Sequence, residues 1–279
     1  MAHVIFSRNA DNSVLSTERI KSLAPAVYSD TRAASLTDRY VSLHTSDVLP
    51  VMADYGYFPT QAAQKRKRGL STGEHASHMI AFSKLGDIVE ADGVRPELIL
   101  YNSHDGSGAV KLFAGCFRFI CSNGIVAGQG FQSRMYHNKT GLAGFEELLR
   151  NTVLSLPAMM NHIEAMRGLT LDYYKAYDMA IAGVATRWAD HTGQERGSYA
   201  VAQTIKDVMN VRRVGDEGYD AWTVFNRIQE GVIRGNAMIR SITDKQPDGV
   251  MRKARPVNSI KEAVRINTEL WAIADAAIA

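Results

Sequence analysis

The segment from Pro96 to Gly128 constrains the fold most, because two apolar runs flank a single polar turn. The runs are rich in Ile, Leu, Val, Phe and Tyr, which favour β-strands. The turn between them reads Asn102-Ser103-His104-Asp105-Gly106-Ser107, and its Asp-Gly step supplies the positive backbone angles that a tight turn needs. The sequence therefore predicts a long β-hairpin over residues 97–120.

Further strands and helices are predicted on both sides of this hairpin. A helix starts at Thr17 after the cap Ser16, and a second helix runs from Val48 to Gly56. Alternation predicts upstream strands at 39–43, 58–65 and 78–85. Apolar residues spaced by three and four predict helices at 145–166, with a kink or break at Pro157, and at 173–188, 199–211, 221–242 and 260–278. The predicted fold class is α+β, with an N-terminal antiparallel β-meander sheet packed on helices and a mostly helical C-terminal half.

Changes in composition and apolar spacing divide the chain into three parts. Residues 1–35 form a polar N-terminal arm, and residues 36–130 form the α+β sheet domain. Residues 131–279 form the helical region, which starts with a polar connector at 132–141 and contains a basic loop at 243–258.

Composition favours a folded protein, since 46% of the 279 residues are hydrophobic and 22% are charged. The first residues lack a basic stretch followed by a long apolar core, and no later apolar run is long enough to cross a membrane. We therefore expect a cytoplasmic protein of a bacterial host cell, with no membrane association. Cys116 and Cys121 lie five apart in an apolar run and match no zinc motif, so two buried, reduced thiols are expected.

Positive charge is concentrated in two places. The run Lys65-Arg66-Lys67-Arg68 falls where two predicted strands would join, and it is either a solvated turn or an anion site. Between Gly231 and Arg265 there are eight cations against three acids, which exceeds the net charge of +3 of the whole chain. The charge is thus unevenly distributed, as expected for a protein that binds a polyanion through local patches.

The histidines suggest no metal centre. His75 and His78 are three apart at the start of a predicted strand, where a pair of surface histidines is the simpler interpretation. His104 and Asp105 are typical hairpin-tip residues, although with Asn102 they also form a candidate functional loop.

No catalytic motif is visible. The glycines around Gly124 to Gly130 match neither the Walker A pattern nor the dinucleotide fingerprint, and no zinc-protease, hydrolase, kinase or deaminase signature occurs. We therefore predict no catalytic residues and no cofactor.

The run LTDRYVSLHTSDVLPVMADYGYFPTQAAQ, the pair His78-Met79, the segment 96–128 and a final ELWAIAD together resemble a phage and plasmid family known as domain of unknown function 932. This family implies no established chemistry. The order of a helix ending at Gly56, a β-meander and a long helix is also similar to single-strand annealing proteins of the Red-beta, Erf and Rad-fifty-two group. That likeness implies a homo-oligomer, such as a ring, whose positively charged groove holds single-stranded DNA.

The leading hypothesis is a mobile-element protein that binds single-stranded DNA and promotes annealing or recombination without catalysis. Tyr55, Tyr57 or Tyr101 would stack bases, although strand aromatics are more often core residues. The predicted DNA contacts are Lys65, Arg66, Lys67, Arg68, Lys111, Arg118, Arg252, Lys253 and Arg255. Two other classes remain open: an anti-defence or anti-restriction protein that binds a host protein, and a nuclease whose acids converge only in the folded chain.

Overall fold

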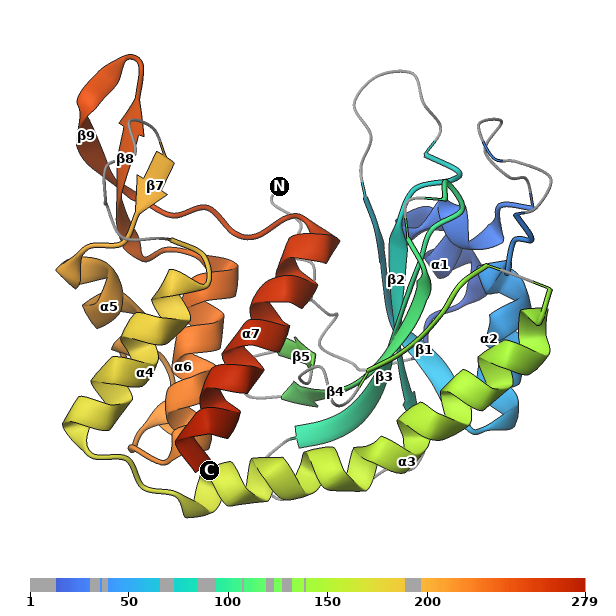
Figure 1. Ribbon diagram of the computed structural model, residues 1–279, viewed down its shortest axis with the longest axis horizontal. Helices are drawn as coiled ribbons and strands as arrows, with labels where there is room; N and C mark the ends of the chain where they lie inside the picture. Colours follow the sequence, from blue (N-terminus) through green and yellow to red (C-terminus); the bar gives the residue numbers. More distant parts are fainter. Residues whose placement is uncertain are drawn as a thin grey trace. The chain divides into compact units, whose positions relative to one another are not determined.

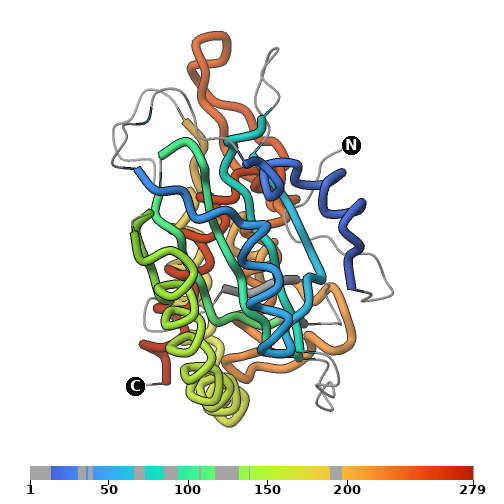
Figure 2. The backbone as a smooth tube through the Cα atoms, turned by 90° about the vertical axis from the view of Figure 1, so that its right-hand side faces the viewer, coloured from blue at the N-terminus to red at the C-terminus, as the bar shows by residue number. Residues whose placement is uncertain are grey.

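The computed structural model describes residues 14–30, 36, 40–65, 73–84, 94–106, 108–118, 123–126, 132–137, 139–188 and 197–278. These residues form two compact units, one up to Met159 and one from Met160 onward. Figure 1 shows the ribbon with its helix and strand labels, and Figure 2 shows the backbone from a second direction. None of the described helices is long and apolar enough to cross a lipid bilayer.

The first unit contains an antiparallel sheet that confirms the predicted meander. Its strands follow one another in space in the order β1-β2-β3-β4-β5, and β6 also pairs with β4. The strands are β1 Tyr57–Gln64, β2 His78–Lys84, β3 Val94–Asn102, β4 Val110–Arg118, β5 Asn123–Val126 and β6 Gln132–Met135. The fold class is α+β, as the sequence predicts.

The centre of this sheet is buried on both faces. Leu98 and Ile99 are neighbours on β3 and therefore point to opposite faces, yet each has 0% of its surface exposed. This explains why the sequence of β3 and β4 is apolar almost throughout rather than at alternate positions. Phe82 and Phe113 complete the same core, and burial of side chains of this size contributes about 1.5–3 kcal/mol each.

Two short helices and one 3-10 turn pack beside the sheet. Their bounds are α1 Thr17–Leu23, η1 Pro25–Tyr28 and α2 Thr45–Asp54. The predicted cap is confirmed, because the hydroxyl of Ser16 accepts a hydrogen bond from the backbone N–H of Arg19. Both α1 and α2 contact β1. After α2 the chain turns at Gly56, whose φ of 81° suits glycine.

The long helix α3, Gly141–Gly168, contains Pro157 without a break. The sequence predicts a kink or break at this proline, whereas the helix continues for 28 residues. Pro157 lies on the exposed side of α3, so water can satisfy the carbonyl group that its missing N–H leaves free. The division between the two units falls within this helix.

The second unit combines helices with a small antiparallel sheet of order β7-β8-β9. Its elements are α4 Tyr173–Ala185, β7 Gly197–Tyr199, α5 Ala202–Met209, η3 Val214–Asp216, α6 Ala221–Arg234, β8 Met238–Thr243, β9 Gln246–Lys253 and α7 Ile260–Ile278. The predicted helices at 173–188 and 260–278 are confirmed. The hydrogen-bonded core of α6 and α7 includes Gln229 and Asn267, whose side chains meet at 3.1 Å.

Two further predicted helices exist in this unit with shorter bounds, and one predicted loop is wrong. The helix predicted at 221–242 ends at Arg234, because Gly235 and Asn236 both adopt positive φ, and β8 follows. The basic loop predicted at 243–258 consists largely of β9, which pairs with β8. The helix predicted at 199–211 starts only at Ala202, after the short strand β7.

Two predictions also fail in the first unit. The described part of the strand predicted at 39–43, residues 40–43, lies outside the sheet, because the backbone of Leu43 bonds to the side chains of His137 and Asn102 instead of to a strand. The polar connector predicted at 132–141 contains β6, which pairs with β4.

Candidate functional site

The β8–β9 hairpin carries a basic surface at one end of the second unit, and both figures show it extending beyond the helices of that unit (Figures 1 and 2). All side chains of β9 except Gly249 are exposed. The segment 238–255 has five cations and two acids. We call the five exposed cations the hairpin cations: Arg240, Lys245, Arg252, Lys253 and Arg255.

The two strands distribute these cations over both faces of the hairpin. Arg252 lies opposite Ile239, whereas its neighbour Lys253 lies opposite Met238 on the other face. Arg240, which lies opposite Met251, shares the face of Lys253. The structure thus brings together the predicted contacts Arg252, Lys253 and Arg255 and adds Arg240 to them.

The bonds that hold the hairpin cations leave their charge uncompensated. Arg240 donates to the backbone carbonyl of Asp248 at 2.5 Å, and Arg252 donates to the hydroxyl of Ser198 at 3.3 Å. Within the described part of the chain, none of the hairpin cations lies within ion-pair distance of a carboxylate. Arg265, by contrast, is held between Glu262 and Glu269.

A second polar surface crosses the large sheet. Tyr101 on β3, Lys111 on β4 and Arg134 on β6 are cross-strand partners, so their side chains form one row on one face. Arg134 also lies 5.9 Å from the ring centre of Tyr136, which is 65% exposed. Lys111, a predicted contact, thus has a cationic neighbour in Arg134. The sequence did not reveal Arg134 as a candidate because the pairing of β6 with β4 was not predicted.

The remaining predicted contacts are not assembled into one track. Lys65 is exposed just after β1, and β2 and β3 separate its strand from that of Lys111. Arg66, Lys67 and Arg68 lie outside the described residues, as does the side chain of Arg118 at the end of β4.

The tyrosines proposed to stack bases have other roles or partial exposure. Tyr57 is buried in the core, as the simpler interpretation predicted. The hydroxyl of Tyr55 donates to the carboxylate of Glu146 at 3.0 Å, which joins α2 to α3. Tyr101 is half-buried in the row that contains Lys111.

The candidate functional loop lies in a cluster of histidines at one end of the large sheet. We define the histidine cluster as five of the eight histidines of the chain, His44, His75, His78, His104 and His137. The ring centre of His104 lies 5.1 Å from that of His78, 5.8 Å from that of His44 and 6.5 Å from that of His137. The backbone N–H of His104 donates to the carbonyl of His75 at 3.3 Å.

The cluster corrects two expectations. His78 is not a surface histidine, because it has 0% exposure as the first residue of β2. The loop after β3 turns as predicted, with a φ of 73° at Gly106, but Asn102 and His104 are also completely buried. Asp105 is half-buried. Residues 102–104 are therefore part of the core, whereas Gly106 is exposed.

Hydrogen bonds tie the loop to the start of α2. The side-chain amide of Asn102 donates to the carbonyl of Leu43 at 3.1 Å and to the hydroxyl of Thr45 at 2.9 Å. The same hydroxyl lies 2.7 Å from Nε2 of His78, whose Nδ1 lies 2.9 Å from the carbonyl of Ala76. These bonds connect β2, β3 and α2 in one buried polar network.

The environment favours the neutral form of His78, His104 and His137. Burial lowers the pKa of His78 to about 4. Burial, followed by the neighbouring imidazoles, lowers the pKa of His104 to about 3. Burial also lowers the pKa of His137. Among the described residues, no group of three or more His, Cys, Asp or Glu side chains is arranged to hold a metal ion.

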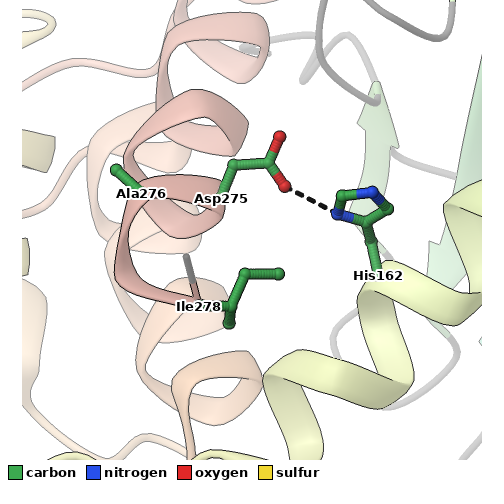
Figure 3. Close-up of a pocket in the computed structure, with 4 residues that line it drawn as sticks. All are labelled: His162, Asp275, Ala276 and Ile278. Carbon is green, nitrogen blue, oxygen red and sulfur yellow. Dashed lines mark ion pairs between the residues drawn. The ribbon is translucent and has the colours of Figure 1, made fainter.

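One pocket lies in the second unit between the end of α3 and α7 (Figure 3). It is lined by His162, Asp275, Ala276 and Ile278, and Nδ1 of His162 lies 2.7 Å from a carboxylate oxygen of Asp275. A histidine and a carboxylate are two members of a hydrolytic triad. None of the four described lining residues is a serine or cysteine.

Fold and surface define an α+β protein with a basic β-hairpin and a buried polar network. The chain belongs to the family described as a domain of unknown function (DUF932), whose model matches residues 33–271. It is similar to two proteins of Escherichia coli (strain K12). The UPF0380 protein YafZ is 29% identical over 264 residues, which cover 94% of this chain and 91% of the relative. The UPF0380 protein YfjQ is 28% identical over 263 residues, which cover 94% of this chain and 90% of the relative.

No solved structure matches this chain. The family resemblance seen in the sequence is therefore confirmed, whereas the remote resemblance to single-strand annealing proteins stays a prediction.

Proposed function

We propose that this protein binds single-stranded DNA without catalysis, in the cytoplasm of a bacterial cell, and promotes annealing or recombination of mobile-element DNA. The β8–β9 hairpin supplies the principal contact with the phosphate backbone. The row of Tyr101, Lys111 and Arg134 supplies a further contact on the large sheet. Assembly into a homo-oligomer repeats both surfaces along one strand and adds avidity.

The uncompensated charge of the hairpin carries this proposal. Three of the five cations lie on the two short strands and Lys245 and Arg255 lie directly beside them, so these like charges repel one another. The two acids of the segment, Asp244 and Asp248, leave a surplus of three positive charges. A polyanion relieves this repulsion and releases its own condensed counterions, which makes binding favourable and dependent on salt. Cations on both faces of an extended ribbon suit a flexible strand that can wrap around it.

The exposed ring of Tyr136 favours single strands over duplexes. Its 65% exposure leaves room for a base to stack on it, and Arg134 beside it can hold the adjoining phosphate. In duplex DNA the bases are already stacked on one another, so this contact would be lost.

The experiment compares labelled single-stranded and double-stranded oligonucleotides of equal length by fluorescence anisotropy, with and without magnesium. The proposal predicts salt-sensitive, sequence-tolerant binding that is tighter for single strands, and no shortening of the label-bearing strand on a gel. Cleavage in magnesium would instead support a nuclease. Absence of binding to either DNA at low salt would refute the proposal and favour an anti-defence protein that binds a host protein.

A further inference from the structure

The hydrogen bonds of His78 fit its neutral form. A carbonyl oxygen only accepts, so Nδ1 of His78 carries a hydrogen and donates it to the carbonyl of Ala76. In the neutral ring Nε2 then presents a lone pair and accepts from the hydroxyl of Thr45. A second proton on Nε2 would reverse this bond and turn the hydroxyl hydrogen of the fully buried Thr45 away from its acceptor.

His137 is held in the same way. Its Nδ1 accepts a hydrogen bond of 3.1 Å from the backbone N–H of Leu43, so this nitrogen also presents a lone pair. Protonation there would leave a backbone N–H without its acceptor. Two rings of the histidine cluster are therefore bonded through nitrogens that a proton would block.

His104 occupies the centre of the cluster and has the least capacity for charge. It is 0% exposed, and neither ring nitrogen has a hydrogen-bond partner within the described part of the chain. Three other imidazoles face it at ring-centre distances of 5.1 to 6.5 Å. A proton on this ring would create a buried charge, and within the described part of the chain neither ring nitrogen has an acceptor at hydrogen-bond distance.

We propose that the histidine cluster is a proton-sensitive latch, which holds the loop 102–106 against the start of α2 while His78, His104 and His137 are neutral and releases the loop when they are protonated. The latch joins elements that are otherwise distant in the chain, since Asn102 bonds to both Leu43 and Thr45. Releasing the loop would expose His104 to water, where its ring can take up a proton.

The charged groups around the latch do not offset the cost of protonating its buried rings. Of the described carboxylates, Asp105 acts on the cluster and raises the pKa of His78, but burial outweighs it. Asp105 and burial together keep Tyr40 neutral, with its pKa raised to about 12. The N-terminal end of α2 begins at Thr45, and its positive dipole adds to the cost of a cation. The other facing groups, His44, His75 and His137, are imidazoles, and they lower the pKa of His104.

The sign and size of the response follow from proton linkage. In the released loop each histidine regains its ordinary pKa of 6.5, whereas in the closed loop the pKa of His78 is about 4 and that of His104 about 3. The released form therefore binds more protons, and the closed form is lost as the pH falls below 6.5. Between pH 7.5 and pH 5.5 each of the two histidines contributes about a tenfold change, nearly all of it below pH 6.5, so the closed-to-released ratio falls about 100-fold over this interval.

Hydrogen exchange measured by mass spectrometry tests the latch in the full chain. We expect peptides covering 43–52 and 98–106 to lose about 100-fold of their protection between pH 7.5 and pH 5.5, after correction for the intrinsic exchange rate. The control is the peptide covering 246–253, which contains no histidine and lies in the other unit. Unchanged protection of the two latch peptides relative to this control would overturn the proposal.

The matched variant is His104→Leu, which removes the titrating ring without breaking a hydrogen bond of the described residues. It should keep the loop closed at pH 7.5 and reduce the loss of protection at pH 5.5 from about 100-fold to about tenfold. A loss as large as that of the wild type would also overturn the proposal. If the variant does not fold, the ring signals of wild-type His104 in an NMR titration decide: a proton taken up only together with loop release supports the latch, and a proton taken up in the closed loop refutes it.

Discussion

Neutralising three of the hairpin cations should weaken DNA binding and make the binding less dependent on salt. The variant R252Q/K253Q/R255Q removes three charges from exposed positions, so it should leave the fold unchanged. Each phosphate contact to a single strand contributes roughly −0.7 to the slope of log K against log salt, so three lost contacts reduce the slope by about 2. At 0.1 M salt the same arithmetic predicts about 100-fold weaker binding, or about 3 kcal/mol.

Fluorescence anisotropy titrations at four salt concentrations measure both the affinity and the slope. The matched control is K175Q/K206Q/K261Q, which removes the same charge from exposed lysines on α4, α5 and α7 of the same unit. If long-range net charge alone attracted the DNA, the two variants would lose affinity equally. Equal losses, or an unchanged slope in the hairpin variant, would refute the assignment of the hairpin as the contact.

Three substitutions test the fold by urea unfolding. Phe113→Ala empties a side-chain site that is 1% exposed and should cost about 3–5 kcal/mol; a cost below about 1 kcal/mol would mean that this core is not packed as described. Asn102→Ala leaves the carbonyl of Leu43 without its donor and should cost about 1–3 kcal/mol. Gly235→Ala places a Cβ 2.6 Å from a backbone oxygen at a φ of 78° and should cost at least about 2 kcal/mol, whereas Gly168→Ala meets nothing within 4 Å and should cost less than about 0.5 kcal/mol.

The large sheet was predictable because its signals are local. Asp105-Gly106 marks the turn between β3 and β4, and Gly106 has the positive φ that this step favours. From β1 to β5 each neighbouring strand is also next in the sequence, whereas the pairing of β6 with β4 skips a strand and was not predicted. Helix α7 was predicted at its observed bounds, since its apolar spacing is regular from Ile260 to Ile278.

The small sheet was missed because its strands continue a helical spacing. Val232, Ile239 and Ile242 are spaced by seven and three and so keep the apolar pattern of α6, although the helix ends at Arg234. The signal that could have revealed the end was Gly235-Asn236, a pair typical of a helix C-terminus. For the same reason β9 is predicted as a basic loop: the predicted helix at 221–242 covers most of β8, so the sequence offers β9 no partner strand.

The histidine cluster could not be predicted from spacing. His44 precedes α2 and His137 follows β6, so only the folded chain brings them near His104. His78 reaches His104 because β2 pairs with β3 in a register that places His78 opposite Asn102. A shift of one residue in that register would turn His78 to the other face of the sheet. No local pattern in the sequence specifies this register.

The sequential strand order has a consequence for synthesis on the ribosome. From β1 to β5, each strand that emerges finds its partner already made, so the sheet can grow by zipping from one turn to the next. Only β6 must reach back past β5 to pair with β4. The N-terminal sheet can therefore assemble before the basic hairpin has been translated, and a nascent chain would acquire its hydrophobic centre before its strongest attraction for polyanions.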